Sequence, residues 1–257
     1  MKNVRTIAVA GLALAVGLAL FAAPARADFY MKQKIHTGAF SVMGQNQPEK
    51  DEVMVFWMGA DKFRTDTESS NSSILLLPDK KMLYMIDHAK KQYSEMPMDF
   101  GKMLGEAAGE EGGEEGQAQA MAMMKGMMGS MKATVTETGE TKTIGSWNCR
   151  KYLLEMDMGM MGKMKAETWA TEDLKMDYTK SFTMANAMMA SMPGFEKILA
   201  EMKKIKGVVV LQTATMNVMG GAEVKSTTEL LEAGEKSAPA GHYDLPAGYK
   251  KVKGMMG

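Results

Sequence analysis

The chain has 257 residues but a single cysteine, Cys149, so no disulfide can form within it. Its three histidines, at positions 36, 88 and 242, are scattered and show no zinc-ligand spacing. Basic and acidic side chains balance at 31 each, which excludes the strongly positive surface that nucleic-acid binding requires. Hydrophobic burial must therefore hold the fold, and the sequence predicts no nucleic-acid partner.

Long apolar runs are missing beyond the N-terminus. Residues 1–27 combine a basic start, an apolar stretch from Ile7 to Ala22 and the small-residue sequence Ala25-Arg26-Ala27, which is the pattern of a cleaved signal peptide. No later stretch approaches the ~20 apolar residues of a membrane span. We therefore expect an exported, periplasmic protein with no integral membrane span after cleavage. Removal of residues 1–27 takes the net charge from zero to −3.

Motifs of the common enzyme classes are also absent. The sequence has no phosphate-binding loop, no dinucleotide-binding glycine motif and no Gly-x-Ser-x-Gly nucleophile motif. Cys149 has no histidine near it in sequence to act as a base, so a buried, unreactive thiol is expected there. The sequence predicts a protein without enzymatic activity.

Short stretches of alternating polarity, separated by turn residues, occupy most of the chain. The first is Asp28–Thr37, and turn signals recur at spacings of 8–12 residues, which favours an antiparallel sheet. About eleven strands and a few helices are expected, and they do not alternate one for one, which argues against a parallel sheet. The predicted class is mainly β with a few helices (α+β).

Three predicted strands are apolar at consecutive positions: 53–58, 74–77 and 208–211. Such strands need cover on both faces. A curved antiparallel half-barrel with helices packed in its concave face supplies this cover and leaves an apolar space beneath the helices. We expect one such domain at 28–251, with a flexible Gly/Glu loop at 105–116 and a tail at 252–257.

A family resemblance is carried by two central segments. The sequence Gly145-Ser-Trp-Asn-Cys149-Arg-Lys-Tyr152, followed by Glu167-Thr-Trp-Ala-Thr171, resembles the exported bacterial family catalogued as domain of unknown function 4412. Looser matches lie at 192–195, 207–210 and 245–251. The family has no settled activity, so the resemblance implies no catalytic residue. More distantly the chain is similar to periplasmic lipoprotein carriers, which implies an open half-barrel that binds acyl chains or lipoproteins.

Methionine is the unusual component, with 31 residues. Methionine can replace leucine in a core, and it also suits adaptable binding surfaces. We predict an exported protein that binds a hydrophobic ligand, either an acyl chain or the lipid of a lipoprotein, in a Met-rich cavity. A Met-rich helix at 117–131 would act as a lid. The expected lining residues are Met54, Phe56, Met58, Tyr84, Met124, Met128 and Trp169.

Two alternatives stay open from the sequence. Soft thioethers bind Cu(I) or Ag(I), and a Gly-rich segment concentrates them at Met156, Met158, Met160, Met161 and Met164. Copper is the cofactor of that alternative, whereas the lipid hypothesis needs none. The other alternative is a structural or interaction protein of the cell envelope whose interior is filled by its own side chains.

Overall fold

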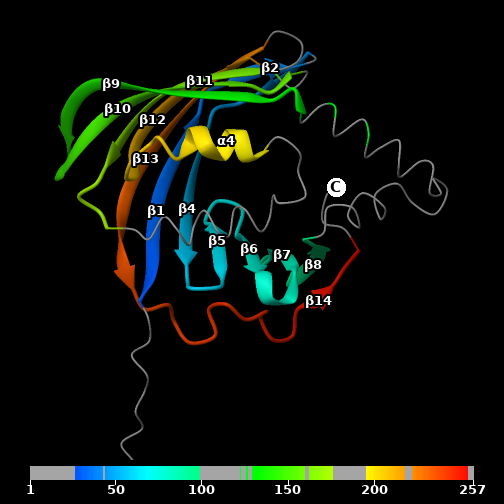
Figure 1. Cartoon of the computed structure of the whole chain (residues 1–257). Coiled ribbons are helices and arrows are strands. Elements are labelled where there is room, and N and C mark those ends of the chain that lie inside the picture. Colours follow the sequence, from blue (N-terminus) through cyan, green and yellow to red (C-terminus); the bar gives the residue numbers. More distant parts are fainter. Residues whose placement is uncertain are drawn as a thin grey trace, which may run out of the picture.

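The computed structural model describes residues 27–42, 44–98, 129–159, 162–175, 195–217 and 222–253, with Ala122 and Gly126 as isolated positions. Its main feature is one twelve-stranded, strongly curved sheet (Figure 1). The strands are β1 (Asp28–Thr37), β4 (Lys50–Met58), β5 (Phe63–Thr67), β6 (Ser72–Leu77), β7 (Met82–Asp87), β8 (Gln92–Pro97), β9 (Lys132–Ile144), β10 (Trp147–Asp157), β11 (Lys163–Thr171), β12 (Val208–Asn217), β13 (Glu223–Lys236) and β14 (Lys250–Lys251).

The strand order is β14-β8-β7-β6-β5-β4-β1-β13-β12-β11-β10-β9. All neighbours are antiparallel except β14, which pairs with β8 in parallel. β1 lies between β4 and β13 and so joins the N-terminal strands to the C-terminal ones. A separate two-stranded ribbon is formed by β2 (Phe40–Val42) and β3 (Gln45–Gln47), and a short 3₁₀ helix, η1 (Pro78–Lys80), connects β6 to β7.

The predicted class, a mainly β protein with a large curved antiparallel sheet, is confirmed. The sheet has twelve strands rather than about eleven, and it ends in two edges, β14 and β9. The described residues include one α-helix, α4 (Phe195–Met202). The other predicted helices lie largely outside the described residues, as do residues 1–26 of the predicted signal peptide. None of the described helices is long and apolar enough to cross a membrane.

The helix α4 defines an inner face of the sheet, on the inside of its curve (Figure 1). Met202 of α4 and the following Ile205 pack against a cluster on β9, β10 and β11, which consists of Val135, Tyr152, Leu154, Ala166 and Ala170. The backbone N–H of Val135, on the edge strand β9, donates to Glu201 Oε2 at 2.9 Å. Helix α4 is thus attached to one end of the sheet.

The register extends this inner face across the whole sheet. Tyr152 pairs with Thr168, and the pairing continues through Gln212, Thr228 and Ile35 to Glu52 of β4. Because side chains on one strand alternate between faces, Met54, Phe56 and Met58 lie on the inner face with Glu52, and residues 53, 55 and 57 lie on the outer face.

The outer face is covered differently in its two halves. Over β6–β8 the C-terminal segment, residues 237–249, crosses the sheet (Figure 1), and its Tyr243, Leu245 and Tyr249 pack against a buried cluster. That cluster consists of Leu75, Leu77, Tyr84 and Ile86. Over β9–β11 the outer face carries ion pairs, such as those of Lys151 with Glu140 and Glu167. Helices therefore do not supply all the cover that the doubly apolar strands need.

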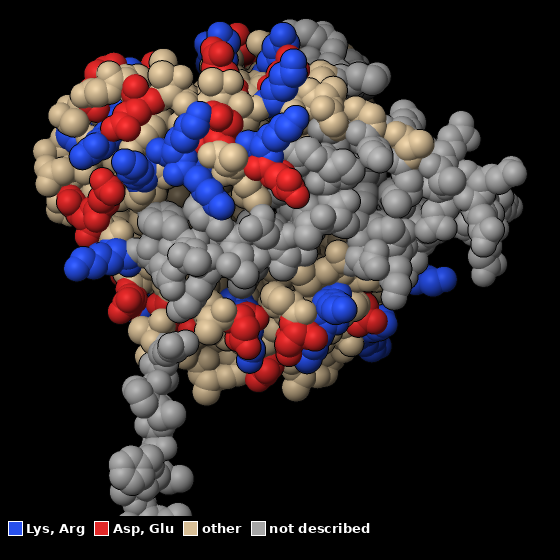
Figure 2. Space-filling model, in the orientation of Figure 1, with Lys and Arg blue, Asp and Glu red and all other residues tan. Residues whose placement is uncertain are grey.

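Acidic and basic side chains are interspersed over the described part of the surface in Figure 2, with no large patch of one sign on that side. This pattern agrees with the equal numbers of basic and acidic residues in the sequence.

Candidate functional site

Three rows of side chains cross the inner face of β1 and β4–β8. Each row takes one residue from each strand, because directly paired residues lie side by side on one face. The apolar row consists of Phe29, Met58, Phe63, Leu76, Leu83 and Met96. The mixed row consists of Met31, Phe56, Thr65, Ile74, Met85 and Ser94. The polar row consists of Gln33, Met54, Thr67, Ser72, Asp87 and Gln92.

The inner face of these strands therefore changes from apolar to polar along the strand direction. A row crosses six strands, or five interstrand spacings of ~4.8 Å, and is about 24 Å long. Phe56, Met58 and Met85 are partly exposed, and Ile74, in the mixed row, is 41% exposed. Helix α4 packs at the other end of the sheet, against β9–β11. The three rows thus form an elongated amphipathic surface, in which Phe29, Gln33 and Leu76 are buried and the exposed part centres on Phe56, Ile74 and Met85.

The structure places three of the predicted lining residues on this surface. Met54, Phe56 and Met58 lie in the polar, mixed and apolar rows respectively. Tyr84 lies on the outer face instead, buried under the C-terminal segment, so it does not join them. Trp169 is buried in a cluster that includes Phe29, with Lys142 Nζ 4.0 Å from the centre of its ring. Met124 and Met128 lie outside the described residues.

Sequence reasoning did not single out the surface residues of β5–β8. These are chiefly Phe63, Ile74, Leu83, Met85 and Met96. Residues 74–77 are all apolar, so no alternation shows which of them face inward. The same holds for β7, where residues 82–86 are all apolar, so the sequence could not tell its inner face from its outer one.

Two of the predicted metal-site methionines are brought together. Met156 on β10 is directly paired with Met164 on β11, and Met164 is in turn paired with Met216 on β12. Met158 follows the end of β10, and residues 160 and 161 lie outside the described residues. Within the described ranges, no group of three His, Cys, Asp or Glu residues could hold a metal ion.

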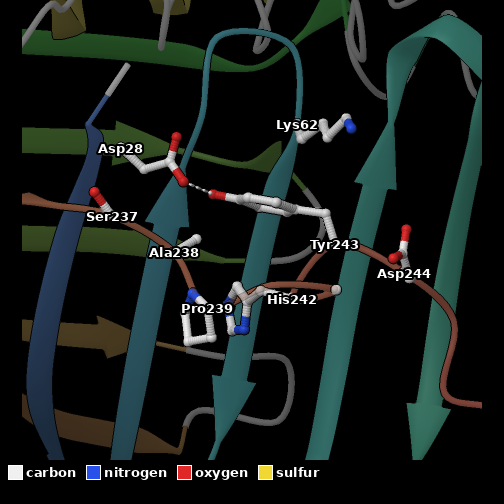
Figure 3. Close-up of a pocket in the computed structure, with 9 residues that line it drawn as sticks. Asp28, Lys62, Ser237, Ala238, Pro239, His242, Tyr243 and Asp244 are labelled. Carbon is white, nitrogen blue, oxygen red and sulfur yellow. Dashed lines mark hydrogen bonds between the residues drawn. The ribbon is translucent and has the colours of Figure 1, made fainter. Parts of the chain in front are cut away.

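A small polar pocket of about 260 Å³ lies beside the C-terminal segment (Figure 3). Its walls include Asp28, Lys62, His242 and Tyr243. The Tyr243 hydroxyl donates to Asp28 Oδ2 at 3.0 Å. Burial and the Asp28 carboxylate raise the pKa of Tyr243, so the phenol stays protonated. Burial, together with the nearby Arg64, lowers the pKa of His242. The pocket's size and polarity do not suit a long apolar ligand.

A hydrogen-bonded network ties the C-terminal segment to β5–β7. Ser73 Oγ contacts both Asp66 and His88, and His88 Nδ1 is 3.0 Å from the Tyr249 hydroxyl. Arg64 donates to Asp66, to Ser73 and to the carbonyl of His242. In a serine-hydrolase triad the carboxylate contacts the histidine, whereas here Asp66 contacts Ser73. Ser73 is also only 2% exposed, so the network holds the segment in place rather than presenting a nucleophile.

Cys149 is buried, as the sequence predicts. Burial raises the pKa of its thiol, which disfavours the reactive thiolate. The described residues therefore offer an amphipathic surface on the inner face of β1 and β4–β8, a row of thioethers on β10–β12 and a closed polar network on the outer face.

The family model described as domain of unknown function (DUF4412) matches residues 37–249. No curated protein matches the chain. One similar solved structure is a domain described as an outer membrane lipoprotein-sorting protein from Vibrio parahaemolyticus, 7% identical, covering 85% of this chain and 89% of its own, with a TM-score of 0.32. A LolA superfamily protein from Nitrosomonas europaea is 8% identical over 83% and 88%, and LprF from Mycobacterium bovis is 9% identical over 85% and 90%, each with a TM-score of 0.29.

Proposed function

We propose that this chain, which belongs to the family described as domain of unknown function (DUF4412), binds an acyl chain on the inner face of β1 and β4–β8. The acyl chain would be a free fatty acid or the lipid of a lipoprotein. The proposal rests on the change of polarity along the strands. The mixed row lies two residues along each strand from the apolar row, and the polar row lies four residues from it. An acyl chain with a polar head group shows the same division, because its methylenes would lie along the apolar and mixed rows and its head group beside the polar row.

The apolar and mixed rows account for the binding energy. Each buried methylene contributes ~0.8 kcal/mol, so a dozen methylenes would outweigh the cost of association. Methionine side chains from β4, β7 and β8 suit such a ligand, because flexible thioethers adapt to chains of different length and bend. Met58, Met85 and Met96 are the methionines concerned.

The polar row supplies partners for the head group. Thr67 and Ser72 carry hydroxyl donors that suit a carboxylate or ester oxygen, whereas Gln33, in the same row, is only 9% exposed. Asp87, in the same row, already accepts from the backbone N–H of Lys90 and pairs with its ammonium, so its negative charge is partly balanced. The head group would therefore lie beside Thr67 and Ser72.

A matched pair of variants tests the location. Ile74 is 41% exposed on the inner face and Leu153 is 39% exposed on the outer face of β10, so each can be changed to lysine with a similar effect on folding. We expect Ile74→Lys to weaken binding of a fluorescent fatty acid by about tenfold or more, because the ligand would bury a charge. Leu153→Lys should bind like the wild-type protein.

Two results would contradict the proposal. One is an equal loss of affinity in both variants, which would place binding elsewhere. The other is the absence of fatty-acid binding by the wild-type protein together with no lipid in native mass spectra of gently purified material. The second result would favour the alternative of an envelope interaction protein.

The predicted signal peptide would place such a carrier in the periplasm, where lipoproteins pass. N-terminal sequencing of protein from a periplasmic extract checks this part separately. We expect a mature chain that begins at Asp28, and a cytoplasmic chain that retains residues 1–27 would contradict it.

A further inference from the structure

Three methionines form a single row on the inner face of the other half of the sheet. Met156 on β10 pairs with Met164 on β11, which pairs with Met216 on β12. The row is bounded by the small Ala133 on β9 and by Val224 on β13. These three residues are far apart in the sequence, and only the register of the sheet brings them together.

The geometry of the row allows the three sulfurs to converge. Directly paired residues have Cβ atoms ~4.5–5.5 Å apart, and methionine has three rotatable bonds beyond Cα, so the outer two side chains can reach over the central one. All three residues are partly buried. Met202 of α4 packs against the same cluster as Met156 and Met164, which places a third thioether on that cluster.

The chemistry of the row is selective. Its donors are neutral, soft thioethers, and the inner-face neighbours Leu154, Ala166 and Ala214 have no oxygen or nitrogen donor in their side chains. Hard cations such as Mg²⁺ or Ca²⁺ need several oxygen ligands, and neither the three methionines nor these three neighbours supply a side-chain oxygen. Cu(I) and Ag(I) prefer sulfur ligands, and their single charge costs less to remove from water than a double charge.

We propose that Met156, Met164 and Met216 form a binding site for one Cu(I) or Ag(I) ion. The row lies close to the end of β10 and the start of β11, next to the turn that holds Gly159 and Gly162. The site is separate from the rows on β1 and β4–β8, so it goes beyond the proposed binding of an acyl chain.

Titration with Cu(I) alone, under anaerobic conditions against a chromogenic Cu(I) chelator, tests the site. The variant Met156→Leu/Met164→Leu/Met216→Leu removes the row, and Met158→Leu/Met160→Leu/Met161→Leu is a matched control that removes the neighbouring thioethers. We expect the wild-type protein to bind one equivalent. Since even outer-shell partners of metal ligands are worth 10- to 100-fold in affinity, the row variant should bind more than about 100-fold less tightly.

The single variant Met164→Leu guards against misfolding of the triple variant. It removes the central ligand with a change that usually costs less than ~1.5 kcal/mol, and its circular dichroism spectrum should match the wild type. We expect its affinity for Cu(I) to fall by about tenfold or more.

The control should keep wild-type affinity within about threefold. The proposal would be overturned by wild-type protein that does not compete with the chelator, by a control that loses as much affinity as the row variant, or by a row variant that loses none. Each of these outcomes leaves the fatty-acid measurements on Ile74→Lys and Leu153→Lys unaffected, so the two proposals can fail independently.

Discussion

At the scale of single residues, two histidines on the outer face couple folding to pH. Burial, followed by the positive charge of Arg64, lowers the pKa of both His88 and His242 from the ordinary 6.5, and the nearby carboxylates, including Asp66, only partly oppose this. Between the lowered pKa values and 6.5 the unfolded chain binds more protons than the folded one. The stability that depends on keeping these two histidines neutral is therefore complete above pH 6.5 and is lost as the pH falls below it.

We expect the melting temperature of the wild-type protein to fall between about pH 7.5 and about pH 5.5. In His88→Gln the fall should be smaller, although this variant also loses hydrogen bonds to Ser73 and Tyr249 and should melt lower at the higher pH. His36→Gln is the control, because His36 is largely exposed and pairs with Asp51 at the surface. Thermal melts of the three proteins at both pH values decide the matter. Equal falls in wild type and His88→Gln would refute the contribution of His88.

Residue positions also show what the sequence alone could reveal of the site. Met54, Phe56 and Met58 share one face of β4, because they lie two residues apart along a single strand. That they line a ligand site stays a prediction. Tyr84 was assigned to the same surface but lies on the other face. Alternation with a period of two residues shows which residues share a face, but not which face is the inner one. The inner face depends on the register with other strands, and a single sequence does not reveal that register.

At the scale of elements, strand positions were predictable and long-range packing was not. The expected strand at 28–37 agrees with β1, and the expected apolar strands at 53–58, 74–77 and 208–211 lie within β4, β6 and β12. The C-terminal segment could not be recognised as the cover of the outer face. Its Pro and Gly residues show no periodicity, and its contacts, such as that of Tyr249 with His88, are with residues more than 150 positions earlier.

One glycine determines how the chain passes from α4 into β12. Gly207 has a φ of +95°, and a Cβ atom there would lie 2.0 Å from the carbonyl oxygen of Thr171 at the end of β11. We expect Gly207→Ala to lower the free energy of unfolding by more than ~2 kcal/mol, because left-handed strain and a backbone clash add together.

Gly139→Ala is the matched control, because Gly139 has a φ of +78° but open space around its Cβ position. It should cost about 1 kcal/mol from backbone strain alone. Urea unfolding of both variants measures the difference, and similar losses of stability would show that the contact with Thr171 is not tight.

At the scale of the whole molecule, the two faces of the twelve-stranded sheet differ in what covers them. The outer face is closed by the C-terminal segment over β6–β8 and carries charged pairs over β9–β11. The inner face holds α4 at one end and the three rows at the other. The change of polarity along the strands appears only when the register of β1 and β4–β8 aligns their inner-face residues into rows. This explains why composition predicted a hydrophobic ligand but not where it would lie.

Photocrosslinking with a fatty acid that carries a diazirine near the end of its chain tests the central claim most directly. After irradiation of the intact mature protein, peptide mapping by mass spectrometry locates the label. We predict labelling in residues 54–96, at inner-face positions of the apolar and mixed rows such as Met58, Ile74 and Met85, and its suppression by excess unlabelled fatty acid. Labelling confined to outer-face residues, or labelling that excess fatty acid does not suppress, would contradict the account.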